Sequence, residues 1–226
     1  MYEDFYSKKL YPLQDKALKT IAGANKSFYL TGGTVLSRLY FHHRYSDDLD
    51  FFVNHYSSFR TETDGIIKKI KNDFKKTEIV LSDANFVRLI VTEKAIALKV
   101  EFINDVQYRA GKVGRTKLFP RTDNWKNILT NKISALSRDE EKDIADILYL
   151  CMKFRFNWQE VIAQAKEKDL WVNELDVSKH IFDFDISRCK KIKWITPPDF
   201  KKLEKLKLSV ARDIVEGTMN RPPGNL

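Results

Sequence analysis

The sequence has 226 residues, of which 43% are hydrophobic and 12% aromatic. This composition excludes an intrinsically disordered chain, and the length is sufficient for one large domain or two small ones. The formal net charge of +9 at pH 7 favours polyanionic partners, although an ordinary basic surface explains the charge alone equally well.

The sequence also indicates the cellular compartment of the protein. The two cysteines stand far apart and outside any Cys/His cluster, which argues against a zinc site and favours a reducing compartment. The N-terminal segment carries charges throughout and lacks the apolar stretch of a signal peptide. No apolar run approaches the roughly 18 residues of a membrane span. We therefore expect a cytoplasmic protein without a membrane partner.

The first half of the chain alternates helical and strand patterns. Apolar residues recur at helical spacing in some segments and alternate with polar residues in others. The last strand patterns follow one another closely, which predicts an antiparallel meander added to a βαβ start. Helices are expected at 3–22, 34–41 and 57–75, and strands at 27–30, 48–53, 77–82, 86–92, 95–103 and 115–119.

The pattern becomes almost entirely helical after about residue 120. Residues 137–140 have the Ser-x-x-Glu form of a capping box, which predicts a helix start there. The fold expected is α+β, with a mixed sheet flanked by helices in a catalytic domain at 1–120 and a helical domain at 121–226. The helices of the second domain are expected at 124–136, 138–156, 158–167, 172–181 and 198–216.

A pair of carboxylates, Asp48 and Asp50, stands in the run RYSDDLDFF. Residues two apart on a strand point to the same face, so both carboxylates face one side while Leu49 points into the core. Two carboxylates this close repel each other and need a cation, and magnesium prefers oxygen ligands. The pair therefore predicts a site for Mg²⁺ or Mn²⁺ that supports phosphoryl transfer.

A third carboxylate, Glu101, stands between the apolar residues Val100 and Phe102. Strand alternation then turns Glu101 away from the core. If the strand at 95–103 lies beside the strand at 48–53, Glu101 completes the metal site and polarises an attacking hydroxyl. We therefore expect three catalytic carboxylates that share the metal ions.

A glycine pair, Gly32 and Gly33, lies between a strand and a helix, followed by Thr34. Glycine lets the backbone approach a ligand closely, and a helix N-terminus offers unpaired N–H groups to a phosphate. Thr34 and Ser37 add hydroxyl donors. These four residues are the predicted site for the triphosphate of a nucleotide.

Each of these motifs has an ordinary structural explanation when taken alone. A Gly-Gly pair between a strand and a helix is usually a turn, an Asp-x-Asp pair is common on exposed strands, and a single strand glutamate usually faces solvent. The ordered combination of strand, Gly-Gly, helix, Asp-x-Asp strand and later Glu-bearing strand is much less common. The combination favours the functional interpretation.

The second half contributes Lys132, Asp143 and Asp146. On a continuous helix Lys132 and Asp143 lie about three turns apart on one face, with Asp146 near it. Lys132 can reach a β- or γ-phosphate, and either aspartate can orient Lys132 or bind the acceptor. A helix start at Ser137 would interrupt this alignment. The alternative is a solvated helix face with i,i+4 charge pairs.

The run LTGGTVLSRLYFHHRYSDDLDFF resembles the DNA polymerase β-like nucleotidyltransferase superfamily, and within it the AbiEii/AbiGii toxin family. The family pattern is an apolar strand, Gly-Gly-Thr/Ala, a short helix and His-Arg-x-Ser-x-Asp-x-Asp. The segment 132–146 is similar to the family's later helical motif, which has a lysine and a closing Asp-x-x-Asp. The first motif is matched here by His43, Arg44, Ser46, Asp48 and Asp50.

The resemblance implies a metal-dependent enzyme that moves a nucleoside monophosphate from an NTP to an acceptor. It implies a toxin with a cognate antitoxin, and tRNA, another RNA or a protein hydroxyl as the acceptor. Arg44 and Ser46 then belong to the nucleotide-binding residues. Two alternatives stay open: a small-molecule nucleotidyltransferase, favoured by a deep acidic pocket, and a non-catalytic nucleotide- or RNA-binding module, favoured if Glu101 points away from the aspartates.

Overall fold

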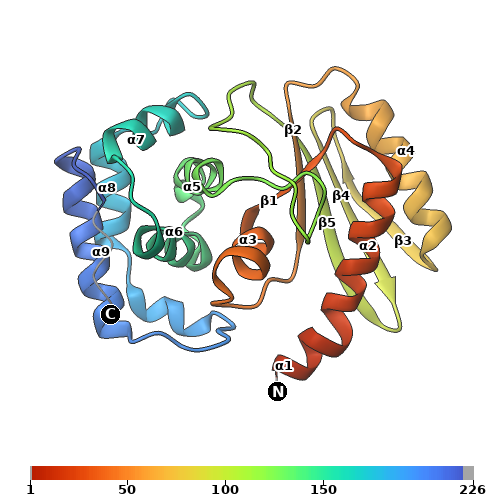
Figure 1. The fold of residues 1–226 in the computed structure, drawn as a ribbon, viewed down its shortest axis with the longest axis horizontal. Coiled ribbons are helices and arrows are strands. Elements are labelled where there is room, and N and C mark those ends of the chain that lie inside the picture. Colours follow the sequence, from red (N-terminus) through yellow and green to blue (C-terminus); the bar gives the residue numbers. More distant parts are fainter. Residues whose placement is uncertain (1, 221–226) are drawn as a thin grey trace. The chain divides into compact units, whose positions relative to one another are not determined.

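Five strands form one mixed sheet in the computed structural model, which describes residues 2–220 (Figure 1). Strand order across the sheet is β1-β2-β5-β4-β3, where β3, β4 and β5 form an antiparallel meander and β2 pairs with β5 in parallel. The strands are β1 (Tyr29–Thr31), β2 (Leu49–Asn54), β3 (Lys76–Ser82), β4 (Phe86–Glu93) and β5 (Ile96–Asp105). The expected meander is confirmed.

Two sequence expectations about this sheet are wrong. β1 pairs with β2 in antiparallel fashion, so the start of the fold is not a βαβ unit with parallel strands. Residues 115–119 form no strand, and the pairing nearby is limited to single bridges from Thr122 to Gly114 and to Leu30. The reason is a tight turn before Pro120, in which the Thr116 N–H donates to the Phe119 carbonyl at 3.2 Å.

Alternation along the strands separates the sheet into a buried and a half-exposed face. In β2 the residues Leu49, Phe51 and Val53 are buried, and the residues between them are half-buried. Phe51 stacks on Phe102 with ring centroids 5.4 Å apart. The buried face of the sheet therefore forms the core of the first unit, and α2 and α4 lie against one side of the sheet (Figure 1).

The helices of the first unit follow the expected order. The segment predicted as one helix at 3–22 runs through α1 (Tyr2–Phe5), a π-helical stretch η1 (Tyr6–Leu10) and α2 (Tyr11–Ala24). The other two expected helices are also confirmed. They are α3 (Gly32–Val35) with its π-helical continuation η2 (Leu36–Phe41), and α4 (Phe59–Asp73).

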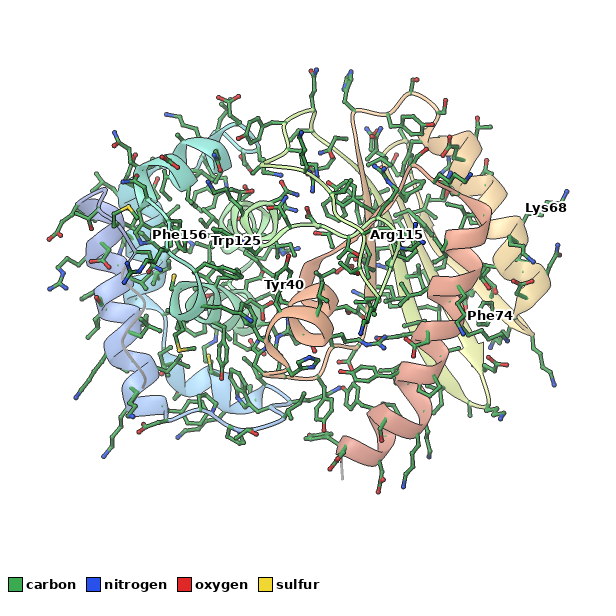
Figure 2. The ribbon with its side chains drawn as sticks, viewed as in Figure 1. Tyr40, Lys68, Phe74, Arg115, Trp125 and Phe156 are labelled. Carbon is green, nitrogen blue, oxygen red and sulfur yellow. The ribbon has the colours of Figure 1, made fainter. Side chains whose placement is uncertain are left out.

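The chain divides into two compact units, Met1–Asn124 and Trp125–Leu226. The second unit is helical over its described residues. The half-buried Trp125 ring stacks on that of Phe154 with centroids 4.3 Å apart. Its centroid lies 5.9 Å from that of the buried Phe156, and Figure 2 labels both Trp125 and Phe156. Its elements are α5 (Trp125–Ser134), η3 (Leu136–Arg138), α6 (Glu141–Lys153), α7 (Trp158–Lys166), α8 (Glu174–Asp183), η4 (Ile186–Lys191) and α9 (Phe200–Val215).

Side-chain caps explain where three of these helices begin. Asn157, Asn173 and Asp199 each accept a backbone N–H from the first turn of α7, α8 and α9. The capping box expected at Ser137 is wrong, because Ser137 lies inside η3 and α6 begins four residues later without a side-chain cap. Asp139 adopts a left-handed conformation, with φ of 53°, which ends η3 and separates the two halves of the predicted box.

The α+β architecture expected from the sequence is confirmed: a mixed sheet with flanking helices precedes a helical region. Among the described residues, no helix has the length and apolar character needed to cross a membrane.

Candidate functional site

The predicted carboxylates lie on the half-exposed face of the sheet. β2 and β5 pair in parallel with Asp50 directly opposite Glu101. Asp48 precedes Asp50 by two residues and shares its face, while Leu49, between them, is fully buried. The structure therefore brings Asp48, Asp50 and Glu101 to one face of two adjacent strands, as the alternation predicted.

A lysine that the sequence reasoning missed lies among these carboxylates. The Lys99 ammonium is 3.0 Å from Asp48 Oδ2 and 3.4 Å from Glu101 Oε1. Partial burial disfavours the charged form of Lys99, but the charges of Asp48, Glu101 and Asp50 outweigh it and raise the pKa of Lys99. Lys99 is therefore a protonated cation at neutral pH, and it partly neutralises the acidic face.

Glu101 is held by two cations through a single oxygen. Arg88 lies opposite Glu101 on β4, and its Nε donates to Glu101 Oε1 at 2.6 Å. Lys99 contacts the same oxygen. Among the described residues, no hydrogen bond or ion pair reaches Glu101 Oε2. Arg88 and Lys99 thus fix the orientation of the carboxylate and leave its second oxygen able to accept a metal bond or a proton.

The donor set fits a divalent cation through the two aspartates. Magnesium is commonly held by one or two protein carboxylates, with water and phosphate oxygens completing the octahedron. About a third of the Asp48 side chain is exposed. No group of three or more His, Cys, Asp or Glu residues in the described part of the chain is arranged to hold a metal ion. The third member, Glu101, is instead engaged by Arg88 and Lys99.

The glycine pair shapes the turn beside the acidic face. Gly32 has a positive φ of 73°, and a Cβ at this position would lie 2.6 Å from Asp50 Oδ2. A Cβ at Gly33 would overlap the guanidinium of Arg44. Both glycines are therefore required by close approaches within the protein: Gly32 makes room for the Asp50 carboxylate and Gly33 makes room for Arg44.

The hydroxyl residues predicted to bind nucleotide are buried and hold the loop that carries the aspartates. Thr34 Oγ1 donates to the backbone carbonyl of Asp48 and lies 2.9 Å from Ser46 Oγ. Ser37 Oγ donates to the Arg44 carbonyl at 2.5 Å. All of these side chains are buried, Arg44 included. These buried side chains position the Asp48 backbone against α3.

The predicted cluster of the second unit also assembles, although α5 and α6 are separate helices. The Lys132 ammonium lies 2.5 Å from Asp143 Oδ1 and 2.9 Å from Asp146 Oδ2. Arg138 adds a contact of 2.9 Å to Asp143 Oδ2. Lys132, Asp143 and Asp146 are all buried. The break after α5 therefore does not separate Lys132 from its aspartates, because α5 and α6 pack against each other.

Sequence reasoning could have found one of the two missed cations. Lys99 lies two residues before Glu101 on the same strand, so alternation alone places it on the acidic face. Arg88 carried no such signal, because its contact with Glu101 depends on the register between β4 and β5.

Comparisons with known proteins identify relatives of this fold. Residues 16–202 match the family model described as nucleotidyl transferase AbiEii toxin, type IV TA system. The crystal structure of JHP933 from Helicobacter pylori aligns with a TM-score of 0.60 at 17% identity, covering 92% of this chain and 93% of that chain. A candidate nucleotidyltransferase from H. pylori aligns with a TM-score of 0.61 at 17% identity, covering 92% and 96%. At this identity the two structures support the fold alone. No curated protein matches the sequence.

Proposed function

We propose a function from one premise: the chain belongs to the nucleotidyl transferase AbiEii toxin family of type IV toxin–antitoxin systems. The proposal is that the Asp48/Asp50 face transfers a nucleoside monophosphate from an NTP to a hydroxyl of an RNA acceptor. The observation that carries it is the parallel pairing of Asp50 with Glu101, which gathers three carboxylates on one face. The family implies an NTP substrate, typically a divalent metal, and a cognate antitoxin.

The reaction joins the acceptor oxygen to the α-phosphorus of the NTP. The bond from the α-phosphorus to the oxygen that bridges to the β-phosphate breaks, and pyrophosphate leaves with the electron pair. A bound Mg²⁺ or Mn²⁺, held by Asp48 and Asp50, supplies charge neutralisation for the phosphates. Glu101 Oε2 accepts the proton of the attacking hydroxyl, because this oxygen has no other partner among the described residues.

The other predicted residues act by positioning. Thr34 and Ser46 fix the backbone of the loop that carries Asp48. Gly32 and Gly33 leave room for Asp50 and Arg44, and Ser37 donates to the Arg44 carbonyl. In the second unit, Asp143 and Asp146 hold the Lys132 ammonium in place. A buried lysine with two carboxylates is a firmly positioned point charge.

The proposal is tested by incubating the protein with each α-labelled NTP, magnesium and total RNA or cell lysate. The label is expected in RNA, and its loss is expected in Asp50→Asn, because that change removes a carboxylate without altering the side-chain shape. Asp64→Asn on α4 is the matched control, because Asp64 is exposed and, within residues 2–220, forms an ion pair with Arg60 alone, at 3.8 Å. Thermal unfolding of both variants establishes that they are folded.

The labelled species separates the competing functions. If the label appears in protein or in a small molecule, the acceptor is not RNA. If Asp50→Asn still labels its acceptor, the carboxylate site does not catalyse the reaction. A non-catalytic module predicts no label at all. That alternative expected Glu101 to point away from the aspartates, whereas it shares their face.

A further inference from the structure

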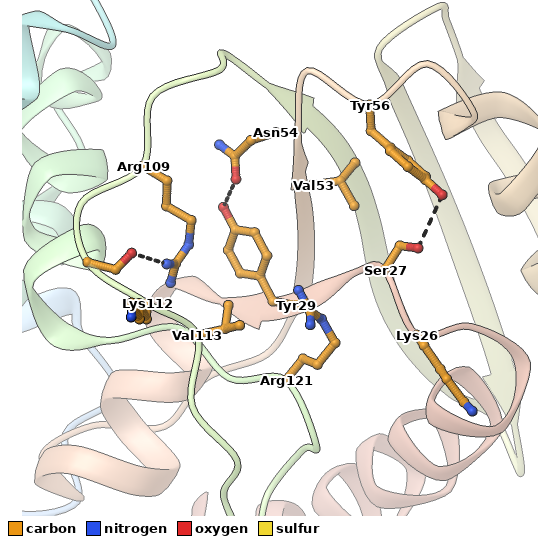
Figure 3. Close-up of a pocket in the computed structure, with 11 residues that line it drawn as sticks. Lys26, Ser27, Tyr29, Val53, Asn54, Tyr56, Arg109, Lys112, Val113 and Arg121 are labelled. Atoms are coloured by element: carbon orange, nitrogen blue, oxygen red, sulfur yellow. Dashed lines mark hydrogen bonds between the residues drawn. The ribbon is translucent and has the colours of Figure 1, made fainter.

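A basic pocket of about 720 Å³ lies in the first unit (Figure 3). Val53 and Asn54 in its wall stand at the end of β2 opposite to the end that carries Asp50. Its volume falls in the range of small-ligand and cofactor sites. Its wall contains four cationic side chains and no carboxylate. The residues that line it are Lys26, Ser27, Tyr29, Val53, Asn54, Tyr56, Arg109, Gly111, Lys112, Val113 and Arg121.

The positive charge of this pocket is largely uncompensated. Arg109 pairs with the buried carboxylate of Asp123. Among the described residues, Lys26, Lys112 and Arg121 form no ion pair, and the Arg121 Nε is buried without a hydrogen-bond acceptor. A buried N–H without an acceptor costs free energy that a bound anion recovers. The pocket therefore favours an anion, and four cationic side chains without a carboxylate make it unsuited to a metal ion.

Aromatic and apolar surface accompanies the charge. The Tyr29 ring lies under the Arg109 guanidinium, whose carbon is 4.9 Å from the ring centroid. The Tyr29 hydroxyl donates to Asn54 Oδ1 at 2.9 Å, which fixes the ring in the wall of the pocket (Figure 3). Burial raises the pKa of Tyr29, so its hydroxyl stays neutral. A ring beside guanidinium groups is the arrangement that holds a nucleic-acid base next to its phosphate.

The pocket and the carboxylates share one face of the sheet. Tyr29 pairs with Phe52 on β2, and Asn54 follows Asp50 by four residues on the same face. At about 3.3 Å per residue, Asn54 lies roughly 13 Å from Asp50 along the strand. A single strand of nucleic acid a few nucleotides long can connect the two positions.

We propose that this pocket binds a phosphate-linked nucleotide of the RNA acceptor strand, upstream of the end that reacts. The inference rests on the proposed function for its choice of acceptor. Arg121 and Lys112 contact the phosphate, and the half-buried Val113 gives the base apolar contact beside the buried Tyr29. The site would then select for a polymer over a free nucleotide, because only a polymer reaches both the pocket and the carboxylates.

The test measures binding apart from catalysis. A fluorescent single-stranded RNA of roughly ten nucleotides, within the site sizes of single-stranded binding folds, is titrated without NTP or metal. Arg121→Gln with Lys112→Gln is expected to raise the Kd on the order of tenfold or more. The slope of log K against log salt should fall by roughly 0.7 for each removed charge. The matched control is Lys68→Gln on α4, whose exposed side chain extends away from the ribbon (Figure 2).

The outcomes separate this inference from the proposed function. Unchanged RNA affinity in the double variant, or equal losses in Lys68→Gln, overturns the pocket assignment even where RNA is labelled by the wild type. An equal loss of affinity for Mg·NTP would assign the pocket to the nucleotide substrate and also overturn it. RNA binding that depends on the pocket, without any labelling of RNA, would support the pocket and reject the proposed acceptor.

Discussion

Replacing Gly32 with alanine tests how the acidic face is positioned. Gly32 has φ of 73°, and the added methyl group would lie 2.6 Å from Asp50 Oδ2. Real Cβ atoms do not approach an oxygen this closely, so the Asp50 carboxylate has to move. The change therefore displaces a proposed metal ligand without removing any carboxylate. It tests whether transfer depends on where the Asp50 carboxylate lies, in addition to its being present.

Two effects set the size of the expected losses in stability and in transfer rate. The left-handed backbone costs a residue with a Cβ roughly 1–2 kcal/mol, which for a chain of this size lowers the Tm by roughly 2–8 °C. A displacement of about 1 Å at a reacting group can cost on the order of a hundredfold in rate. Gly32→Ala is thus expected to lose about two orders of magnitude in NMP transfer while most of the protein stays folded at room temperature.

The assay is transfer of labelled nucleotide to RNA, with Tm measured on the same preparation. Gly65→Ala is the control, because Gly65 lies inside α4 with nothing within 4 Å of an added Cβ. Alanine there should stabilise the helix by roughly 0.5–1 kcal/mol and leave transfer unchanged. Wild-type transfer by a folded Gly32→Ala protein would refute the argument that Asp50 needs this glycine.

Three further predictions follow from other contacts. Lys99→Gln removes the ammonium 3.0 Å from Asp48, so half-maximal activity should need several-fold less Mg²⁺, and a higher requirement would contradict the view that Lys99 competes with the metal. Lys132→Met removes a cation that lies 2.9 Å from the buried Asp146 carboxylate, and urea unfolding should show a loss of roughly 3–5 kcal/mol, whereas a loss below about 1 kcal/mol would argue against the buried pair. Burial raises the pKa of Cys189 to about 12 and that of Cys151 well above its usual range, so both thiols stay protonated at pH 8 and should react with a thiol reagent only after denaturation.

The acidic face was predictable because strand alternation is a local property. Leu49 and Phe102 mark the core side of their strands, so the polar residues between the apolar ones had to face the other way. The pairing of Asp50 with Glu101 was expected only conditionally. The register that places them opposite each other depends on packing between distant segments, which no local pattern contains.

Other features of the site were out of reach for the same reason. The glycine pair was expected to approach a ligand, whereas the structure shows Gly32 close to Asp50 and Gly33 close to Arg44, both long-range contacts within the protein. The contact between Lys132 and Asp143 was expected along one helix, but it forms between two helices after a break. In each case tertiary packing, which no local pattern contains, determined the neighbours of these residues.

The parallel pairing of β2 with β5 also determines when the proposed transferase site can form during synthesis. Between these strands the chain forms α4, β3 and β4, so their alignment closes a long loop and is a slow, non-local step of folding. A chain emerging from the ribosome has both aspartates long before it has Glu101. It cannot complete its acidic face until β5 has been synthesised and inserted between β2 and β4. On the proposed function, a partly made chain lacks the proton acceptor Glu101 and stays inactive, and the strand order itself sets this delay.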